Sequence, residues 1–339
     1  MPPQKAKFQM SDVSPADILA AQARIEGYIH HTPLFQSETL NQILGHRIVF
    51  KAENLQKTGA FKLRGAMNTL LSLREWGELA GTVCAFSSGN HAQAVAYAAR
   101  TLGVKAKIFI PKQASAVKIA ATRACGAEVV VTENRQIAEA SVADLISQGA
   151  TFVHPYDNPY VIAGQGTACL EALQDGVQAD AVFAPCGGGG LMSGTWLATR
   201  VLRPQAKVFA CEPSMANDAH QSVQSGKIVR FPETPMTIAD GVRTLSVSER
   251  TLAYLQQIDG FYEIEEDEIT YWSQWLSHLL KLVIEPTCAM SMAGVTRWLK
   301  TQNAQKTVLV ILSGGNISAE THALIWNEDK LGLVPTGFV

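Results

Sequence analysis

Strand-like and helix-like segments alternate along most of this chain, and this alternation restricts the fold more than any other feature of the sequence. Short runs rich in Val, Ile, Phe and Ala are separated by longer stretches of helical pattern. The expected strands are residues 47–51, 83–86, 106–110, 128–131, 151–153, 179–184, 207–211 and 307–312. Strands separated by helices of this length build βαβ units, in which helices cover both faces of a parallel sheet. The sequence therefore predicts an α/β protein made of open, twisted, mostly parallel sheets.

The expected helices fill the intervals between the strands. They are residues 15–26, 66–74, 92–102, 116–124, 136–147, 161–173, 192–201 and 269–282. Helix 269–282 carries apolar side chains at helical spacing, so we expect this stripe to lie in the core or at a subunit interface. Segment 218–243 is richer in Pro, Gly and polar residues, and we expect irregular structure there.

Length and charge exclude several classes of partner. A chain of 339 residues is long enough for two subdomains. The net charge of -2 at pH 7 gives no basic surface for nucleic acid or for an anionic membrane. No apolar run reaches the length of a membrane span. We therefore expect small molecules and further copies of the chain as partners.

The cysteines and the N-terminal residues indicate the compartment. Six cysteines are scattered along the chain without a Cys-x-x-Cys pair, which is typical of a reducing environment rather than of a zinc site or a disulfide framework. The first residues lack the apolar segment of a secretory signal. The sequence therefore predicts a cytoplasmic protein.

The stretch 58–66, Thr-Gly-Ala-Phe-Lys-Leu-Arg-Gly-Ala, carries the candidate reactive group. Its Lys62 follows the apolar pair Ala60 and Phe61 and is expected immediately before a helix. Burial disfavours the charged form of a lysine, so such a position supplies a neutral, nucleophilic amine that suits a Schiff base. An isolated lysine at a helix start is more often an ordinary side chain whose stem covers apolar surface. The loops described next favour the first interpretation.

Three loops of unusual composition follow expected strands, at the edge where parallel sheets bind ligands. Residues 187–190 are four glycines, whose backbone N–H groups can converge on a phosphate, although the loop fits neither a Walker motif nor a dinucleotide fingerprint. Residues 87–91, Ser-Ser-Gly-Asn-His, form a second anion site or merely a helix cap. The third loop is residues 313–316, Ser-Gly-Gly-Asn. A lysine with one site for phosphate and one for carboxylate indicates an enzyme that acts on amino acids with pyridoxal phosphate.

These motifs also support a resemblance to a known family. The stretch 58–66, the loops 87–91 and 186–191, residues 212–219 (Glu-Pro-Ser-Met-Ala-Asn-Asp-Ala), residues 285–287 (Glu-Pro-Thr) and residues 312–316 occur in the order found in the fold-type II pyridoxal-phosphate enzymes. The sequence resembles the threonine/serine dehydratases and serine racemases of that family from about residue 30 to about residue 320. The resemblance implies a large cofactor-binding domain formed by residues 1–52 and 156–339. It also implies a small mobile substrate domain, residues 53–155, and a homodimer.

The resemblance assigns a role to each candidate residue. Lys62 would form the Schiff base with pyridoxal 5'-phosphate and act as the base at the substrate Cα. The other cofactor-binding residues would be Phe61, Asn90, Gly187, Gly188, Gly189, Gly190, Leu191 and Ser313. The substrate carboxylate would be held by Ser87, Ser88, Gly89, Asn90 and His91. An uncharged hydroxyl at Ser313 would leave the pyridine ring largely neutral, which suits prompt loss of a β-substituent.

Two features of the resemblance concern racemisation and metal binding. Ser88 matches the serine that acts as acid/base on the second substrate face in serine racemases. Glu212, the Ala216 carbonyl and Asp218 match a segment that binds Mg2+ or Ca2+, and hard cations prefer such oxygen ligands. Without the resemblance, the two acids would be read as solvated loop residues.

The sequence thus predicts dehydration of L-threonine, L-serine or a related 3-hydroxy amino acid to a 2-oxo acid and ammonia. A serine racemase with side elimination activity and a 3-hydroxyaspartate ammonia-lyase remain alternatives. A cysteine-synthase-like enzyme is disfavoured, because those enzymes carry different loops around the substrate and the phosphate. A non-catalytic binding protein is disfavoured by the complete set of motifs.

Overall fold

The strands form two separate sheets in the computed structural model, which describes residues 12–87, 89–112, 114 and 116–335. The larger sheet has the order β1-β2-β10-β7-β8-β9 and the smaller one the order β5-β4-β3-β6. Neighbouring strands are parallel in both sheets, except for the antiparallel pair β1 and β2. The expected mixed α/β fold with mostly parallel sheets is confirmed.

The larger sheet brings several strand ends together at one edge. Its strands are β1 (Leu34–Phe35), β2 (Arg47–Ala52), β10 (Thr307–Leu312), β7 (Ala181–Pro185), β8 (Lys207–Pro213) and β9 (Gly260–Ile264). Leu312 pairs with Ala52, and Pro185 pairs with Cys211. The loops that follow β2, β10, β7 and β8 therefore emerge side by side.

Helices cover both faces of the larger sheet. One face is covered by α1 (Pro15–Ile25), α7 (Pro159–Gln174), α8 (Gly190–Leu202) and α10 (Glu249–Leu255). The other face is covered by α2 (Glu38–Leu44), α11 (Glu266–Leu280), α12 (Pro286–Ala289) and α13 (Ser291–Leu299). Successive residues of β10 alternate between the two cores, with Leu309 and Ile311 in one and Val308 and Val310 in the other. This alternation is what a strand buried on both faces produces.

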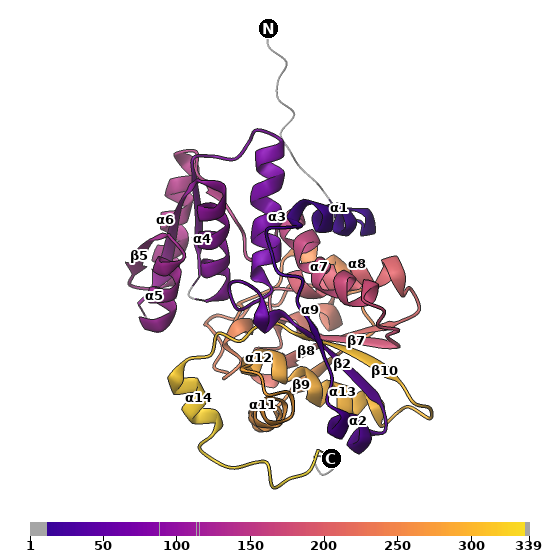
Figure 1. The fold of residues 1–339 in the computed structure, drawn as a ribbon. Coiled ribbons are helices and arrows are strands. Elements are labelled where there is room, and N and C mark those ends of the chain that lie inside the picture. The colour runs from indigo at the N-terminus through magenta and orange to yellow at the C-terminus, as the bar shows by residue number, and fades with distance from the viewer. Residues whose placement is uncertain (1–11, 88, 113, 115, 336–339) are drawn as a thin grey trace.

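The smaller sheet lies within one continuous part of the chain. Its strands are β5 (Glu128–Thr132), β4 (Lys105–Pro111), β3 (Thr82–Phe86) and β6 (Thr151–Phe152), and its helices are α4 (Asn90–Leu102), α5 (Ala116–Ala124) and α6 (Arg135–Ser147). Helix α3 (Lys62–Glu75) contacts both α4 and α7, so it lies between the two sheet units (Figure 1). α14 (Ala319–Ile325) packs against α11.

Most expected elements are present, and two expectations require correction. Helix α3 begins at Lys62 rather than at residue 66, so the lysine is the first residue of the helix. Within the segment expected to be irregular, Asp218–Ser225 forms helix α9, which ends at Gly226 with a φ of 68°. The apolar stripe of α11 lies in the core, where Trp272 is 1% exposed. Among the described residues, no helix is both long and apolar enough to cross a membrane.

Candidate active site

The loop before α3 is fixed to the loop that follows β10. The Phe61 N–H donates to the Ser313 carbonyl at 3.0 Å, and the Gly315 N–H donates to the Gly59 carbonyl at 2.9 Å. Gly59 has a φ of +70°, and a Cβ there would lie 2.4 Å from Asn316 Oδ1, so only glycine fits without strain. This backbone pairing places Lys62 beside Ser313 at the carboxyl edge of the larger sheet.

The environment of Lys62 favours an uncharged amine. Its side chain is partly buried, its Nζ donates to the Pro155 carbonyl at 2.9 Å, and the same atom lies 5.0 Å from the centre of the Phe61 ring. Burial lowers the pKa of Lys62 from 10.5 to about 8. A substantial fraction of the amine is therefore neutral near physiological pH, as a nucleophile or a base requires.

The four glycines after β7 form a loop that accepts no side chain. Gly189 has a φ of +85°, and α8 begins at Gly190. A Cβ at Gly188 would lie 2.2 Å from the Tyr156 ring, and one at Gly187 would lie 3.0 Å from the backbone of Val242. The loop thus presents bare backbone at a helix N-terminus, which is an arrangement that binds phosphate. Leu191, the second residue of α8, is buried.

A second helix N-terminus follows β3. Gly89 precedes α4, which starts at Asn90, and the Gly89 N–H donates to Ser87 Oγ at 3.2 Å. Ser88 falls outside the described residues. The His91 ring is 3% exposed and donates from Nε2 to the Val153 carbonyl at 2.7 Å. Burial and the neighbouring Lys62 lower the pKa of His91 to about 3, so its ring is neutral and only its backbone N–H is left for a substrate carboxylate.

Asn90 belongs to a partly buried polar group that joins three parts of the chain, and Glu285 is its buried member. Its Nδ2 donates to the two Glu285 carboxylate oxygens at 2.9 and 3.1 Å. The Asn316 side chain donates to Asn90 Oδ1 at 2.8 Å, and the Asn316 backbone N–H donates to Glu285 Oε1 at 3.0 Å. Burial and the nearby Asp240 raise the pKa of Glu285 to about 7, although Asn90 and Lys118 oppose this rise. No role for Glu285 was expected from the sequence, where the Glu-Pro-Thr motif is the only signal for it.

Of the two candidate metal-binding acids, Glu212 lies at the end of β8 and Asp218 is the first residue of α9. Glu212 and Asp218 are each 0% exposed. Burial and the neighbouring Asp218 raise the pKa of Glu212, while burial raises the pKa of Asp218 to about 7. The carboxylate oxygens of Asp218 make no hydrogen bond of normal geometry, although the nearby Val247 N–H and Thr244 hydroxyl oppose the rise of its pKa, whereas Glu212 accepts the His220 N–H at 2.9 Å. Two buried acids of this kind provide donors that suit a hard cation. No group of three or more Asp, Glu, His or Cys side chains arranged for a metal occurs in the described part of the chain.

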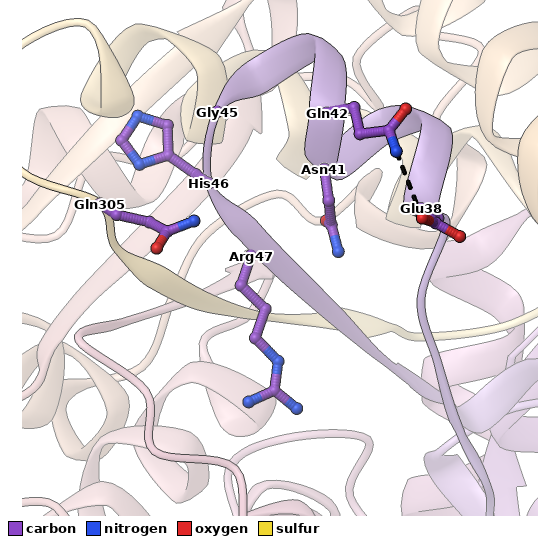
Figure 2. Close-up of a pocket in the computed structure, with 7 residues that line it drawn as sticks. All are labelled: Glu38, Asn41, Gln42, Gly45, His46, Arg47 and Gln305. Carbon is purple, nitrogen blue, oxygen red and sulfur yellow. Dashed lines mark hydrogen bonds between the residues drawn. The ribbon is translucent and has the colours of Figure 1, made fainter.

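A cavity of about 330 Å³ lies at the opposite edge of the larger sheet (Figure 2). It is lined by side chains of α2 and by His46 and Arg47, where β2 begins. Ligands of parallel sheets bind beyond the carboxyl ends of the strands. This cavity at an amino end is therefore separate from the candidate site around Lys62.

Comparison with known proteins agrees with the geometry. The family model described as "Pyridoxal-phosphate dependent enzyme" matches residues 25–314. The chain belongs to this family. Among curated relatives of this pyridoxal-phosphate dependent enzyme, the L-threo-3-hydroxyaspartate ammonia-lyase of Saccharomyces cerevisiae is 43% identical over 315 residues, which cover 91% of this chain and 95% of the relative. The serine racemase of Dictyostelium discoideum is 41% identical over 325 residues, which cover 94% of this chain and 99% of the relative.

The solved structures show that this pyridoxal-phosphate dependent enzyme has the type II fold. The crystal structure of the T.th. threonine deaminase superposes with a TM-score of 0.83 at 43% identity, covering 90% of this chain and 99% of that chain. The residues at the candidate site fit the cofactor, because a glycine loop without room for side chains and a partly neutral lysine both lie at one sheet edge.

Proposed function

We propose that this enzyme removes water from a 3-hydroxy-L-amino acid and yields a 2-oxo acid and ammonia. The proposed substrates are L-serine, L-threonine and 3-hydroxyaspartate. The observation that carries the proposal is the partly neutral amine of Lys62. This residue lies next to Ser313, and its amine donates to the Pro155 carbonyl. The neighbouring Tyr156 packs on the glycine loop. A base at Cα, a phosphate site and a carboxylate site are the parts that this elimination needs.

Each part of the site has a proposed task. When bound, pyridoxal phosphate supplies the electron sink that makes a Cα–H bond acidic. Lys62 would hold the cofactor and, once the substrate amine has released it, would take the proton from Cα. The β-hydroxyl would leave with its bonding electrons and take up a proton to become water, and the released enamine would hydrolyse to the 2-oxo acid and ammonia. The backbone N–H groups at the start of α4 bind the substrate carboxylate, because a helix N-terminus attracts anions. Ser313 would offer the pyridine nitrogen an uncharged partner, and the Asn90 amide, whose Nδ2 donates to Glu285, would contact a cofactor oxygen.

The proposal is tested with a 2-oxo-acid assay on L-serine, L-threonine and both diastereomers of 3-hydroxyaspartate. We expect turnover of at least one substrate by the wild-type protein and none by Lys62→Ala. The Lys57→Ala variant removes a nearby lysine whose Nζ donates to the Tyr28 carbonyl, and it serves as the matched control that retains turnover. A cofactor-loaded wild-type protein without turnover on the whole panel would refute the proposal.

Serine racemisation is the second candidate, and its support is the 41% identity to the Dictyostelium discoideum serine racemase together with a hydroxyl at position 88. In this reading Ser88 exchanges a proton with the substrate face opposite Lys62. Chiral chromatography of D-serine formed from L-serine measures this activity against pyruvate formation. Racemisation as the main activity requires that Ser88→Ala abolish D-serine formation while elimination persists.

We further propose that Glu212, the Ala216 carbonyl and Asp218 hold Mg2+ or Ca2+. The support is the buried pair of carboxylates, one of which makes no hydrogen bond of normal geometry through either oxygen. Isothermal titration of the EDTA-treated protein with each ion tests this site. No heat of binding with the wild-type protein, or equal binding by Asp218→Asn, would contradict it.

The remaining proposals concern organisation. We propose that residues 53–155 move as a small domain against residues 1–52 and 156–339 and exclude water from the substrate. The ion pair between Lys118 of α5 and Asp240 of the short helix η3 (Asp240–Val242) supports such a closed arrangement. A homodimer and a cytoplasmic location are proposed as well, the latter supported by six cysteines without disulfides. Light scattering of the purified protein measures the subunit number.

A further inference from the structure

Four charged side chains form a buried cluster next to the first turn of α3. Its members are Lys51 of β2, Glu53 of the short helix η1 (Glu53–Leu55), Arg64 of α3 and Glu171 of α7. Lys51, Glu53 and Arg64 are 0% exposed and Glu171 is 4% exposed. Two cations and two anions are buried here, and at the surface end of the cluster Lys51 also lies 3.9 Å from the exposed Asp175, which pairs with His31. We call this set the buried charge cluster.

The Arg64 guanidinium is the centre of the cluster. Its Nε and Nη2 donate to the two oxygens of Glu53, each at 2.8 Å, which is the bidentate geometry that fixes a guanidinium in one orientation. Its Nη1 donates to Glu171 Oε2 at 2.9 Å, and Nη2 also lies 3.1 Å from Glu171 Oε1. Lys51 donates to Glu171 and, at 2.6 Å, to the Thr32 carbonyl. The orientation of Arg64 is therefore determined by two separate carboxylates.

The cluster joins the segment by which the chain leaves the larger sheet to helix α7. The chain leaves that sheet after Ala52 through Glu53, and Glu171 lies in the last turn of α7. Arg64 binds both Glu53 and Glu171, and it lies two residues after Lys62. The Lys62 amine donates to the return segment, residues 153–158, at Pro155. The first turn of α3 is thus tied to the exit segment and to α7 through Arg64, and to the return segment through Lys62.

Close backbone contact supports this arrangement. A Cβ at Gly164 would lie 2.6 Å from the Arg64 carbonyl oxygen, and a Cβ at Gly65 would lie 2.5 Å from the Gln165 side chain. The Gly65 N–H donates to Gln165 Oε1 at 3.1 Å. Helices α3 and α7 therefore approach closely enough that a small change in the orientation of Arg64 would move the start of α3.

Stability alone gives no reason for four buried charges, because apolar side chains of similar volume often replace a buried ion pair without loss of stability. The geometry points to a positioning role: the buried charge cluster sets the orientation of the first turn of α3 and so directs the Lys62 amine at its reacting atom. Arg64, Glu53, Lys51 and Glu171 are positioning residues, since they touch neither substrate nor cofactor. This inference rests on the proposed function, in which Lys62 takes a proton from Cα.

The test compares two variants of the holoenzyme. Glu53→Gln leaves one buried cation in excess, so we expect both a lower Tm and slower chemistry. The double variant Glu53→Gln/Arg64→Met removes one charge of each sign and leaves the Lys51–Glu171 pair, so we expect its Tm to recover towards the wild-type value. Its chemistry should stay slow, by about 10²-fold, because a displaced base loses its near-attack geometry.

The chemistry is read as exchange of the Cα hydrogen of L-alanine with D2O, followed by NMR and divided by the amount of cofactor bound. L-Alanine has no β-hydroxyl, so the rate reports proton transfer alone. Borohydride reduction followed by peptide mapping confirms that the cofactor is still attached to Lys62. The control is Lys330→Met, which removes another buried lysine whose Nζ lies 2.6 Å from Asp267 Oδ1. This control should lower the Tm and leave the exchange rate at the wild-type value.

The outcomes separate the inference from the proposed function. Recovery of both Tm and exchange rate in the double variant means that the cluster is purely structural and overturns the inference. If the double variant does not fold, Arg64→Lys retains the charge without the bidentate geometry, and an unchanged exchange rate per bound cofactor overturns the inference equally. If the wild-type protein itself shows neither exchange nor turnover in the 2-oxo-acid assay, the proposed function fails. In that case the inference is tested by a pH titration of the absorbance of the Lys62–cofactor linkage. Equal midpoints in the wild type and the double variant would refute the positioning role of the buried charge cluster.

Discussion

Replacing Lys62 by methionine should stabilise the cofactor-free protein near neutral pH. Burial lowers the pKa of this lysine from 10.5 in the unfolded chain to about 8 in the folded one. The difference of about 2.5 units corresponds to about 3 kcal/mol at 1.36 kcal/mol per unit. Between these two pKa values the unfolded chain binds more protons, so the stability of the wild-type protein rises with pH. Below pH 8 the full cost of about 3 kcal/mol opposes folding.

The methionine variant lacks this cost but also lacks the hydrogen bond to the Pro155 carbonyl, which contributes about 1 kcal/mol. At pH 7 we therefore expect Lys62→Met to be more stable than wild type by about 2 kcal/mol, with the advantage shrinking as the pH rises through 8. Above the unfolded pKa the wild type should become the more stable of the two, because only the lost hydrogen bond then remains.

The assay is urea unfolding of the hydroxylamine-stripped proteins at several pH values between 7 and 9.5. Lys62→Arg is the matched control, because a guanidinium stays charged throughout and should never share the gain of the methionine variant. A difference between Lys62→Met and wild type that is independent of pH, or a less stable methionine variant at pH 7, would show that burial does not lower the pKa of the amine.

Three further predictions concern the glycine loop, the buried acids and the ion pair that joins the two sheet units. Gly188→Ala places a methyl group against the Tyr156 ring, and such overpacking costs about 1–3 kcal/mol. Cofactor affinity, measured by fluorescence titration, should therefore fall by about 10- to 100-fold. Unchanged affinity would contradict the proposed phosphate site. Asp218→Asn removes a buried charge, so the Tm in EDTA should rise while the Tm increase caused by Mg2+ disappears; an undiminished response to Mg2+ would exclude Asp218 as a ligand. Lys118→Met removes a cation that lowers the pKa of Glu285, so the acidic limb of the kcat/KM profile should move to higher pH if that carboxylate must be ionised.

The sequence was sufficient to predict the architecture, because buried parallel strands have a composition that few other elements share. All eight expected strands are present, and the two that were missed lie at the edges of the larger sheet, where β1 has only two residues and β9 is largely half-buried. Edge strands have weaker patterns because one side lacks a neighbour. Helix α9 was missed because its residues are mostly polar, although Ala219 and Ser222 are buried by tertiary contacts.

The candidate site was predicted only where the chemistry shows in local composition. The glycine loop and Lys62 carry such a signal. The helical start of α3 does not, since the conformation of Arg64 and Gly65 depends on Glu171 and Gln165, about a hundred residues further along the chain. Glu285 likewise meets Asn90 across a separation of 195 residues. Partners this distant leave no periodic pattern, so only the folded structure shows them.

The position of β10 has a consequence for how the chain is made. This strand lies between β2 and β7, with Thr307 paired to Arg47 and Val308 paired to Ala181. A ribosome releases β2 early, yet that strand has no parallel neighbour until residues 307–312 have emerged. The backbone partner of the lysine loop, Ser313–Gly315, appears later still. Such non-local pairing folds slowly. A nascent chain therefore acquires a site able to hold the cofactor only after residues 307–315 have emerged.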